Sequence, residues 1–142
     1  MGAGYDLALI KLKSGFDTEV VPICLIGKER LKTMKTNDCY LKDFRLGSKI
    51  PEKIEISSSN KCKQVFESAF DENYMLCANQ INCKENRGAP IICKDQNEYY
   101  LAAMASWGRD CSSPSTTTVE AFTKLFDNEY IDWINTTIHL NK

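Results

Sequence analysis

The sequence lacks the features that mark several large classes of protein. No apolar run approaches the roughly 18 residues that suggest a transmembrane helix, and the formal net charge is only -1. A chain without a basic excess gives no support to nucleic-acid binding or to a polybasic membrane patch. Residues 1–6 contain neither a basic segment nor an apolar core, so they do not resemble a signal peptide. We therefore expect no nucleic-acid partner and no membrane partner.

Histidine is also scarce. The single histidine, His139, lies three residues from the C-terminus, where an exposed tail residue is the simplest expectation. One imidazole without any C-x-x-C pair argues against a zinc site. We expect neither a metal nor a cofactor.

Cysteine, by contrast, is abundant, with seven in 142 residues. This density is high for a cytosolic protein and indicates an oxidising compartment, although seven buried free thiols remain an alternative. An odd number leaves one cysteine without an internal partner. Residues 135–137 read Asn-Thr-Thr, an N-glycosylation sequon at Asn135 that agrees with secretion. We expect the full-length protein to be extracellular, although this chain carries no signal peptide.

The length fits one domain, and most of its patterns predict short strands. Residues 6–12 form an apolar run that predicts a buried strand, and Pro22 predicts extended structure around it because proline cannot continue a helix. Alternation over residues 53–57 predicts a half-buried strand, and residues 58–60 offer an N-cap for a short helix that ends at Phe66. Further extended segments are expected at residues 39–46, 90–94, 98–107 and 120–125.

A closing helix is predicted after Asp127 or Asn128, either of which can cap it. Its expected apolar face consists of Tyr130, Ile131, Trp133, Ile134 and Ile138. Many short strands with one terminal helix indicate an all-β barrel or sandwich.

Three blocks, in order, resemble the trypsin-like serine proteases. They are residues 6–25, residues 75–108 and residues 122–134. The family writes its nucleophile loop as C-x-G-D-S-G-G-P, and residues 83–90 here read C-K-E-N-R-G-A-P. The resemblance implies a chymotrypsin-like antiparallel β-barrel, with the last strands of a first barrel and a C-terminal α-helix. It also identifies residues 1–142 as the C-terminal portion of such a peptidase domain.

The same resemblance assigns the cysteines. It implies the disulfides Cys39–Cys93, Cys62–Cys77 and Cys83–Cys111, and it leaves Cys24 unpaired. Because the family counterpart of Cys24 usually holds an N-terminal chain, a missing N-terminal barrel or chain is expected to pair through this residue.

The catalytic positions implied by the resemblance have changed. A serine protease needs a nucleophile, a base, a group that orients the base and oxyanion donors. Arg87 stands at the nucleophile position, and a guanidinium cannot attack a carbonyl. Glu85 replaces an oxyanion-hole glycine, and Asn86 replaces the aspartate that binds the new N-terminus on activation. Asp6 keeps the position of the triad aspartate, but the family histidine would precede this chain, so Asp6 is expected to have nothing to orient.

The substrate-binding positions are mixed. Ile81 and Glu120 occupy specificity-pocket positions where the family carries an acidic residue and a glycine. Ser106, Trp107 and Gly108 retain the strand that pairs with substrate backbone, an edge that could accept a peptide by strand addition. Structural carry-over of these three residues is the alternative.

Together these residues predict a protein that is not an enzyme. The favoured function is a non-catalytic serine protease homologue, a secreted binding or regulatory module for an unknown protein partner or peptide. The alternative is a truncated isoform or partial gene model of a trypsin-like endopeptidase homologue, to which proteolysis would be assigned by similarity. A hydrolase that uses other residues is a third hypothesis.

Overall fold

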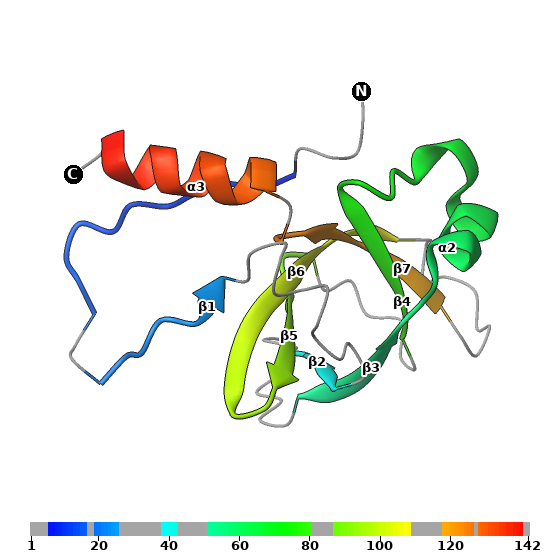
Figure 1. Ribbon diagram of the computed structural model, residues 1–142, viewed down its shortest axis with the longest axis horizontal. Coiled ribbons are helices and arrows are strands. Elements are labelled where there is room, and N and C mark those ends of the chain that lie inside the picture. The colour runs from blue at the N-terminus through cyan, green and yellow to red at the C-terminus, as the bar shows by residue number, and fades with distance from the viewer. Residues whose placement is uncertain are drawn as a thin grey trace.

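The computed structural model has a six-stranded antiparallel barrel, a C-terminal helix beside it and an extended N-terminal arm (Figure 1). It describes residues 6–16, 19–25, 38–42, 51–80, 87–108, 118–126 and 128–140. The strands are β1 (Cys24–Leu25), β2 (Cys39–Leu41), β3 (Glu52–Ile56), β4 (Met75–Gln80), β5 (Pro90–Asp95), β6 (Glu98–Gly108) and β7 (Thr118–Lys124). The helices are α2 (Ser59–Phe66), the 3₁₀ turn η2 (Glu67–Ala69) and α3 (Asn128–Leu140). The expected all-β barrel with a closing helix is confirmed.

β6 closes the barrel because it pairs with strands on both sides. The sheet order is β1-β6-β5-β2-β3-β4-β7, and an additional pairing of β6 with β7 completes the ring. β5 pairs with β6 from Glu98 to Met104, and β7 pairs with it from Ala103 to Gly108. Register shifts interrupt both ladders, between Ile91 and Ile92 and between Ala105 and Trp107. Such irregularities bend the strand, and a long strand such as β6 needs these bends in order to curve around a small barrel.

Two apolar clusters hold this architecture together. The first fills the barrel, with Leu41, Ile91 and Phe122 each at most 1% exposed. The second lies beneath α2, where Phe66 and Phe70 pack with Met75. Burying one such side chain contributes about 1.5–3 kcal/mol relative to leaving it exposed.

Several local predictions are confirmed. Ile54 is buried and its neighbours Lys53 and Glu55 are exposed, as the alternation in β3 requires. Ser58 is the N-cap of α2, with its side chain accepting a hydrogen bond from the Lys61 amide.

The prediction of a buried strand over residues 6–12 is wrong. In the described residues 6–12 no strand forms, and the arm over residues 6–25 exposes large apolar side chains, with Ile10 at 84% and Val21 at 85%. The apolar pattern predicts burial only if another element covers it. No described element covers most of this arm, apart from the short parallel pairing of β1 with β6 at Cys24 and Leu25.

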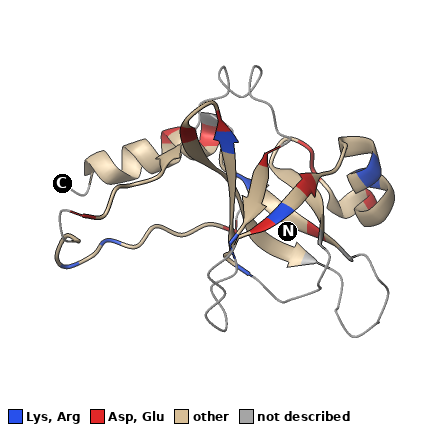
Figure 2. Ribbon diagram, turned by 90° about the horizontal axis from the view of Figure 1, so that it is seen from below, with Lys and Arg blue, Asp and Glu red and all other residues tan. Residues whose placement is uncertain are grey.

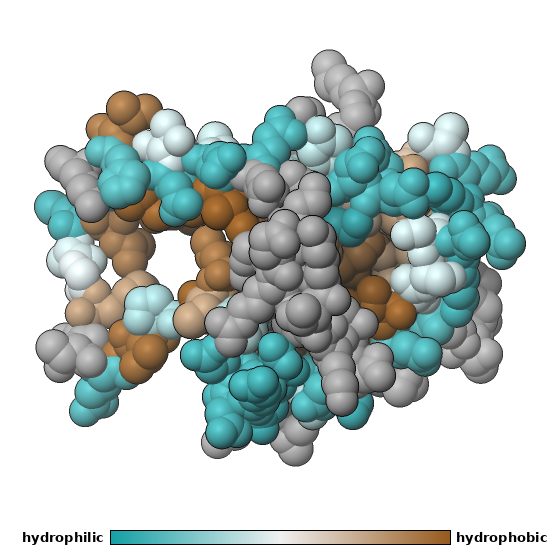
Figure 3. Space-filling model, in the orientation of Figure 1, coloured by the Kyte–Doolittle hydropathy of each residue, from teal (hydrophilic) through white to brown (hydrophobic). Residues whose placement is uncertain are grey.

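The apolar face predicted for α3 is only half covered. Tyr130 and Ile134 are buried, whereas Trp133 and Ile138 are 39% and 50% exposed. The arm runs alongside the helix in Figure 1, and a hollow of about 300 Å³ between them is lined by Leu7, Glu129, Tyr130 and Trp133. Figure 3 shows apolar side chains on both sides of the opening between arm and helix.

Two disulfides tie the barrel. Cys39–Cys93 joins β2 to β5, where the two residues lie opposite each other, and Cys62–Cys77 joins α2 to β4. Cys24 is a free, exposed thiol. The expected pair Cys83–Cys111 lies outside the described residues.

No helix in the described part of the chain combines the length and apolar character that crossing a membrane requires.

Candidate functional site

The end of the predicted nucleophile loop is anchored on β6. The Gly88 amide donates a hydrogen bond to the Ala105 carbonyl at 2.8 Å, and the Ala105 amide donates to the Ala89 carbonyl at 2.9 Å. Gly88 has a φ of +79°, a left-handed conformation that glycine adopts without steric cost. These contacts place exposed Arg87 next to the segment of β6 that leads into Ser106.

Ser106 brings the arm to the same corner of the barrel. Its Oγ donates a hydrogen bond of 2.6 Å to Oδ2 of Asp6, across 100 positions of sequence. Ser106 is 6% exposed, whereas Asp6 is classed as exposed. A hydrogen bond with one ionised partner is shorter and stronger than a neutral one. The expectation that Asp6 has nothing to orient missed this contact, because no local pattern links residues so far apart.

The corner therefore brings the Asp6 carboxylate and the Ser106 hydroxyl into contact, with exposed Arg87 on the adjoining loop. The Ser106 hydroxyl already donates to Asp6, and Arg87 holds a permanent positive charge with no basic lone pair. His139, the only imidazole of the sequence, is exposed on α3, the helix that closes the chain. Of the other residues predicted here, Ile81, Glu85 and Asn86 lie outside the described residues.

At Ser106–Gly108 only one edge of β6 is paired with a described strand. Trp107 and Gly108 pair with Ala121 and Glu120 of β7. On the opposite edge the pairing with β5 ends at Met104. Gly88 and Ala89 form hydrogen bonds with Ala105, and no described strand pairs with this edge beyond that residue. The Trp107 ring packs edge-on against Phe66 with centroids 4.8 Å apart, which fixes this end of β6 on α2.

Glu120 is buried on β7, on the side of β6 away from this edge. Glu120 is 7% exposed, and in the sheet register it lies between Gly108 of β6 and Ala78 of β4. Buried carboxylates need a cation or several hydrogen-bond donors to offset the loss of water. Glu120 therefore places a carboxyl group inside the sheet, between β4 and β6.

The remaining surface gives little sign of a further charged site. Figure 2 shows acidic and basic residues interspersed over the elements it colours. Among the described residues, no group of three or more His, Cys, Asp or Glu side chains could hold a metal ion. Asn135, the sequon asparagine, is exposed on α3.

Comparison with known proteins identifies this architecture. A family model described as Trypsin matches residues 2–134. The chain belongs to the trypsin family. Among solved structures, the chain is similar to a kallikrein-related peptidase 10 complex with Zn²⁺, with a TM-score of 0.55 and 25% identity over 73% of this chain and 50% of that one.

Curated relatives of this trypsin-family chain include several much longer proteases. It is 28% identical to coagulation factor XI of Bos taurus over 93% of this chain, and 28% identical to transmembrane protease serine 5 of Homo sapiens over 94%. It is 27% identical to ovochymase of Halocynthia roretzi over 96%. The chain spans 23%, 32% and 9% of these three relatives, so it corresponds to less than a third of each.

Proposed function

We propose that this trypsin-family chain is a non-catalytic, extracellular binding module. The observation that carries the proposal is Arg87, which stands at the nucleophile position of a loop whose backbone is still anchored to β6. The end of this loop is held against β6, next to a side chain that cannot form an acyl intermediate. Loss of one member of a catalytic unit removes most of the rate, and the single histidine of residues 1–142, His139, lies on α3 rather than on the segments that carry Arg87 and Ser106.

The proposed binding element is the open edge of β6 at Ser106–Gly108. An extended peptide can add to such an edge through main-chain hydrogen bonds. Gly108 has no side chain, so a basic side chain of the peptide could extend across it toward Glu120, its partner on β7. The Asp6–Ser106 hydrogen bond supports a rigid geometry at the start of this segment. Glycosylation of exposed Asn135 is part of the extracellular proposal.

A fluorophosphonate probe tests the absence of catalysis. The probe reacts with activated serines, so the protein should remain unlabelled under conditions that label trypsin completely. Labelling at a single serine, located by mass spectrometry, would overturn the proposal.

Peptide binding is tested separately by calorimetry with extended peptides that differ only in one Lys or Glu. The Lys peptide is expected to bind more tightly, and Glu120→Gln should remove the difference. Equal affinity for both peptides would contradict the assigned role of Glu120.

The exposed arm favours a second proposal. Residues 1–142 would be the C-terminal portion of a longer peptidase-homologue domain, as a truncated isoform or partial gene model, and a first barrel would cover the arm. Support comes from the apolar side chains around the arm (Figure 3), from the free thiol of Cys24 and from the matched structure, of which the chain covers half. Exposed apolar patches of this kind promote aggregation. A soluble, cooperatively melting monomer of residues 1–142 would count against this second proposal.

A further inference from the structure

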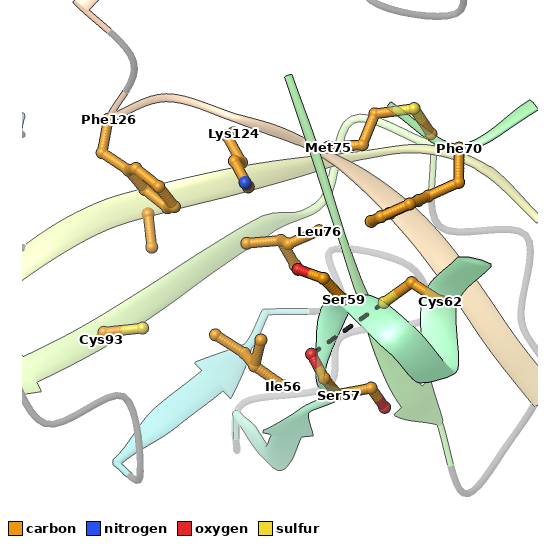
Figure 4. A pocket seen from close by; sticks show the side chains of 11 residues that line it. Ile56, Ser57, Ser59, Cys62, Phe70, Met75, Leu76, Cys93, Lys124 and Phe126 are labelled. Carbon is orange, nitrogen blue, oxygen red and sulfur yellow. Dashed lines mark hydrogen bonds between the residues drawn. The ribbon is translucent and has the colours of Figure 1, made fainter. Parts of the chain in front are cut away.

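A small cavity of about 130 Å³ lies between the two apolar clusters of the core. The barrel cluster with its packed neighbours contributes Ile56, Leu76, Ala102 and Phe126 to the wall, and the cluster beneath α2 contributes Phe70 and Met75. Figure 4 shows side chains from both clusters around one space. The candidate peptide edge at Ser106–Gly108 takes no part in the lining, so what the cavity binds is independent of the function proposed above.

The wall of this cavity favours an aromatic ring. Phe70 and Phe126 present two phenyl rings, and Met75 presents a thioether. Aromatic rings attract one another in edge-to-face and offset arrangements, and a thioether sulfur makes favourable contacts with ring edges. An apolar cavity of about 150 Å³ in another protein binds benzene. The 130 Å³ found here therefore has room for about one ring.

The cavity provides no free charge for an ionic ligand. Lys124 lines it, but its ammonium donates a hydrogen bond to the Glu72 carbonyl, lies 5.6 Å from the centroid of the Phe126 ring and has a further interaction. Among the described residues of the lining, none carries a carboxylate. An anion would have to compete for a cation that is already engaged, and a cation would meet a like charge. Because either ion would also lose water on entry, the ligand is expected to be uncharged.

Two serines give the cavity a polar side. Ser57 and Ser59 lie at the junction where β3 ends and α2 begins, and both line the cavity. A hydroxyl group both donates and accepts hydrogen bonds. Either serine can therefore pair with a hydroxyl group of a ligand whose ring occupies the apolar part.

We propose that this cavity binds a small phenol, a molecule with one aromatic ring, a hydroxyl group and no net charge. The ring lies between Phe70 and Phe126, and the hydroxyl pairs with Ser57 or Ser59. Leu76 and Ala102 on the barrel side are 5% and 1% exposed, so the ring enters the core itself. A space of 130 Å³ that is filled by a ring leaves no room for a polypeptide backbone, so the occupant is a free small molecule rather than a tyrosine side chain of a protein partner.

Ligand comparison on the unaltered chain is the first test. Methyl NMR spectra are recorded during titration with phenol, cyclohexanol, benzoate and benzylamine. Phenol is expected to shift the methyl signals of Ile56, Met75 and Leu76 but not that of Ile138, which lies on α3. Cyclohexanol, which lacks the aromatic ring, should bind about fivefold more weakly. Benzoate and benzylamine, which keep the ring but carry a charge, should bind about tenfold more weakly. Equal affinity for phenol and either cyclohexanol or benzoate, or phenol shifts confined to Ile138, would overturn the proposal.

The source of the phenol group is tested with p-cresol and N-acetyltyrosine amide. Both carry the same ring and hydroxyl, but the second also carries peptide groups. We expect p-cresol to cause the same shifts as phenol and N-acetyltyrosine amide to cause none, because the cavity has no room for the peptide groups. Binding of N-acetyltyrosine amide as tightly as p-cresol would assign the cavity to a tyrosine of a partner protein and overturn the proposal of a free ligand.

The last test removes the two serine hydroxyls. Ser57→Ala combined with Ser59→Ala should weaken phenol binding about fivefold, as expected for loss of one hydrogen bond, and should leave toluene binding unchanged. Ser68→Ala is the matched control, because Ser68 is an exposed serine of η2 that does not line the cavity. Unchanged phenol affinity in the double variant, or equal losses for phenol and toluene, would refute the assigned pairing. If the double variant does not fold, the titrations of the unaltered chain decide alone.

Discussion

Arg87 and Ser106 together determine what the corner at the end of β6 can do. Arg87 supplies charge at the position that the loop motif predicts for the family's hydroxyl, and the Ser106 hydroxyl donates to Asp6. The two residues lie on neighbouring segments, because the residues that follow Arg87 form backbone hydrogen bonds with Ala105, which precedes Ser106. These two side chains are the chemical basis of the proposal that the corner holds a ligand and forms no covalent intermediate.

Arg87→Ser is expected to restore no hydrolysis. The new hydroxyl would have no imidazole beside it, since His139 lies on α3, and an unactivated serine is a weak nucleophile. Turnover of peptide esters by Arg87→Ser should equal that of the control Arg87→Ala. Serine-specific turnover above this control would show that a base is present.

Ser106→Ala should destabilise the chain by about 1 kcal/mol. The variant removes the donor to Asp6, and the cost stays near that of an ordinary hydrogen bond because the exposed carboxylate can regain water. Urea unfolding measures the loss. In an Asp6→Asn background the same change should cost less, and an equal cost in both backgrounds would mean that the two residues do not interact.

At the scale of elements, β2, β3 and β5 share a polar cluster at their edge. The Tyr40 hydroxyl donates to Asp38 at 2.8 Å, and the Lys53 ammonium lies 3.4 Å from the same carboxylate. The hydrogen bond from Tyr40, followed by the smaller effect of Lys53, holds the pKa of Asp38 below its ordinary value of 3.8. The same hydrogen bond raises the pKa of Tyr40 above its ordinary value of 10.0.

This cluster predicts a small acid dependence of stability. A carboxyl group with a lowered pKa in the folded state stabilises it above the unfolded value of 3.8, and the contribution disappears as the pH falls through the folded pKa. Asp38→Asn should therefore reduce the loss of stability below pH 3.8 and change little at pH 7 beyond the lost contact. Unfolding curves at several pH values measure the difference. Parallel profiles for both proteins would contradict the role of Asp38.

At the scale of the whole molecule, a barrel cross-linked by disulfides is joined to an N-terminal arm whose large apolar side chains remain exposed. The two disulfides lie in the buried clusters, with Cys39, Cys77 and Cys93 fully inaccessible to solvent. Cys24, by contrast, lies exposed on β1 at the end of the apolar arm. The described residues thus divide into a cross-linked barrel and an arm whose thiol and apolar side chains are exposed.

Thiol labelling of the native chain tests this separation. One maleimide per chain is expected, at Cys24, because four cysteines form the described disulfides and Cys83 is predicted to pair with Cys111. Peptide mapping identifies the labelled residue. Three labels per chain would show that Cys83 and Cys111 are free thiols, and protection of Cys24 would show that the arm is covered.

The sequence alone determined the elements whose signals are local. Three such signals involve only residues close together in the sequence: the alternation in β3, the Ser58 cap of α2 and the apolar spacing of α3. The cysteine-rich motifs indicated the family. Only the tertiary structure decided which apolar residues are buried. Residues 6–12 carry the pattern of a buried strand, yet burial depends on a covering element that no local pattern reveals.

Contacts between segments distant in the sequence were likewise decided only by the tertiary structure. The Asp6–Ser106 hydrogen bond joins residues 100 positions apart, and the cavity near Lys124 is built from separate strands and a helix. Both arise from barrel closure, which brings these segments together through backbone pairing rather than through any signal in their own residues. Side-chain identity therefore determined the chemistry that the chain could offer, and closure of the barrel decided which of these groups meet.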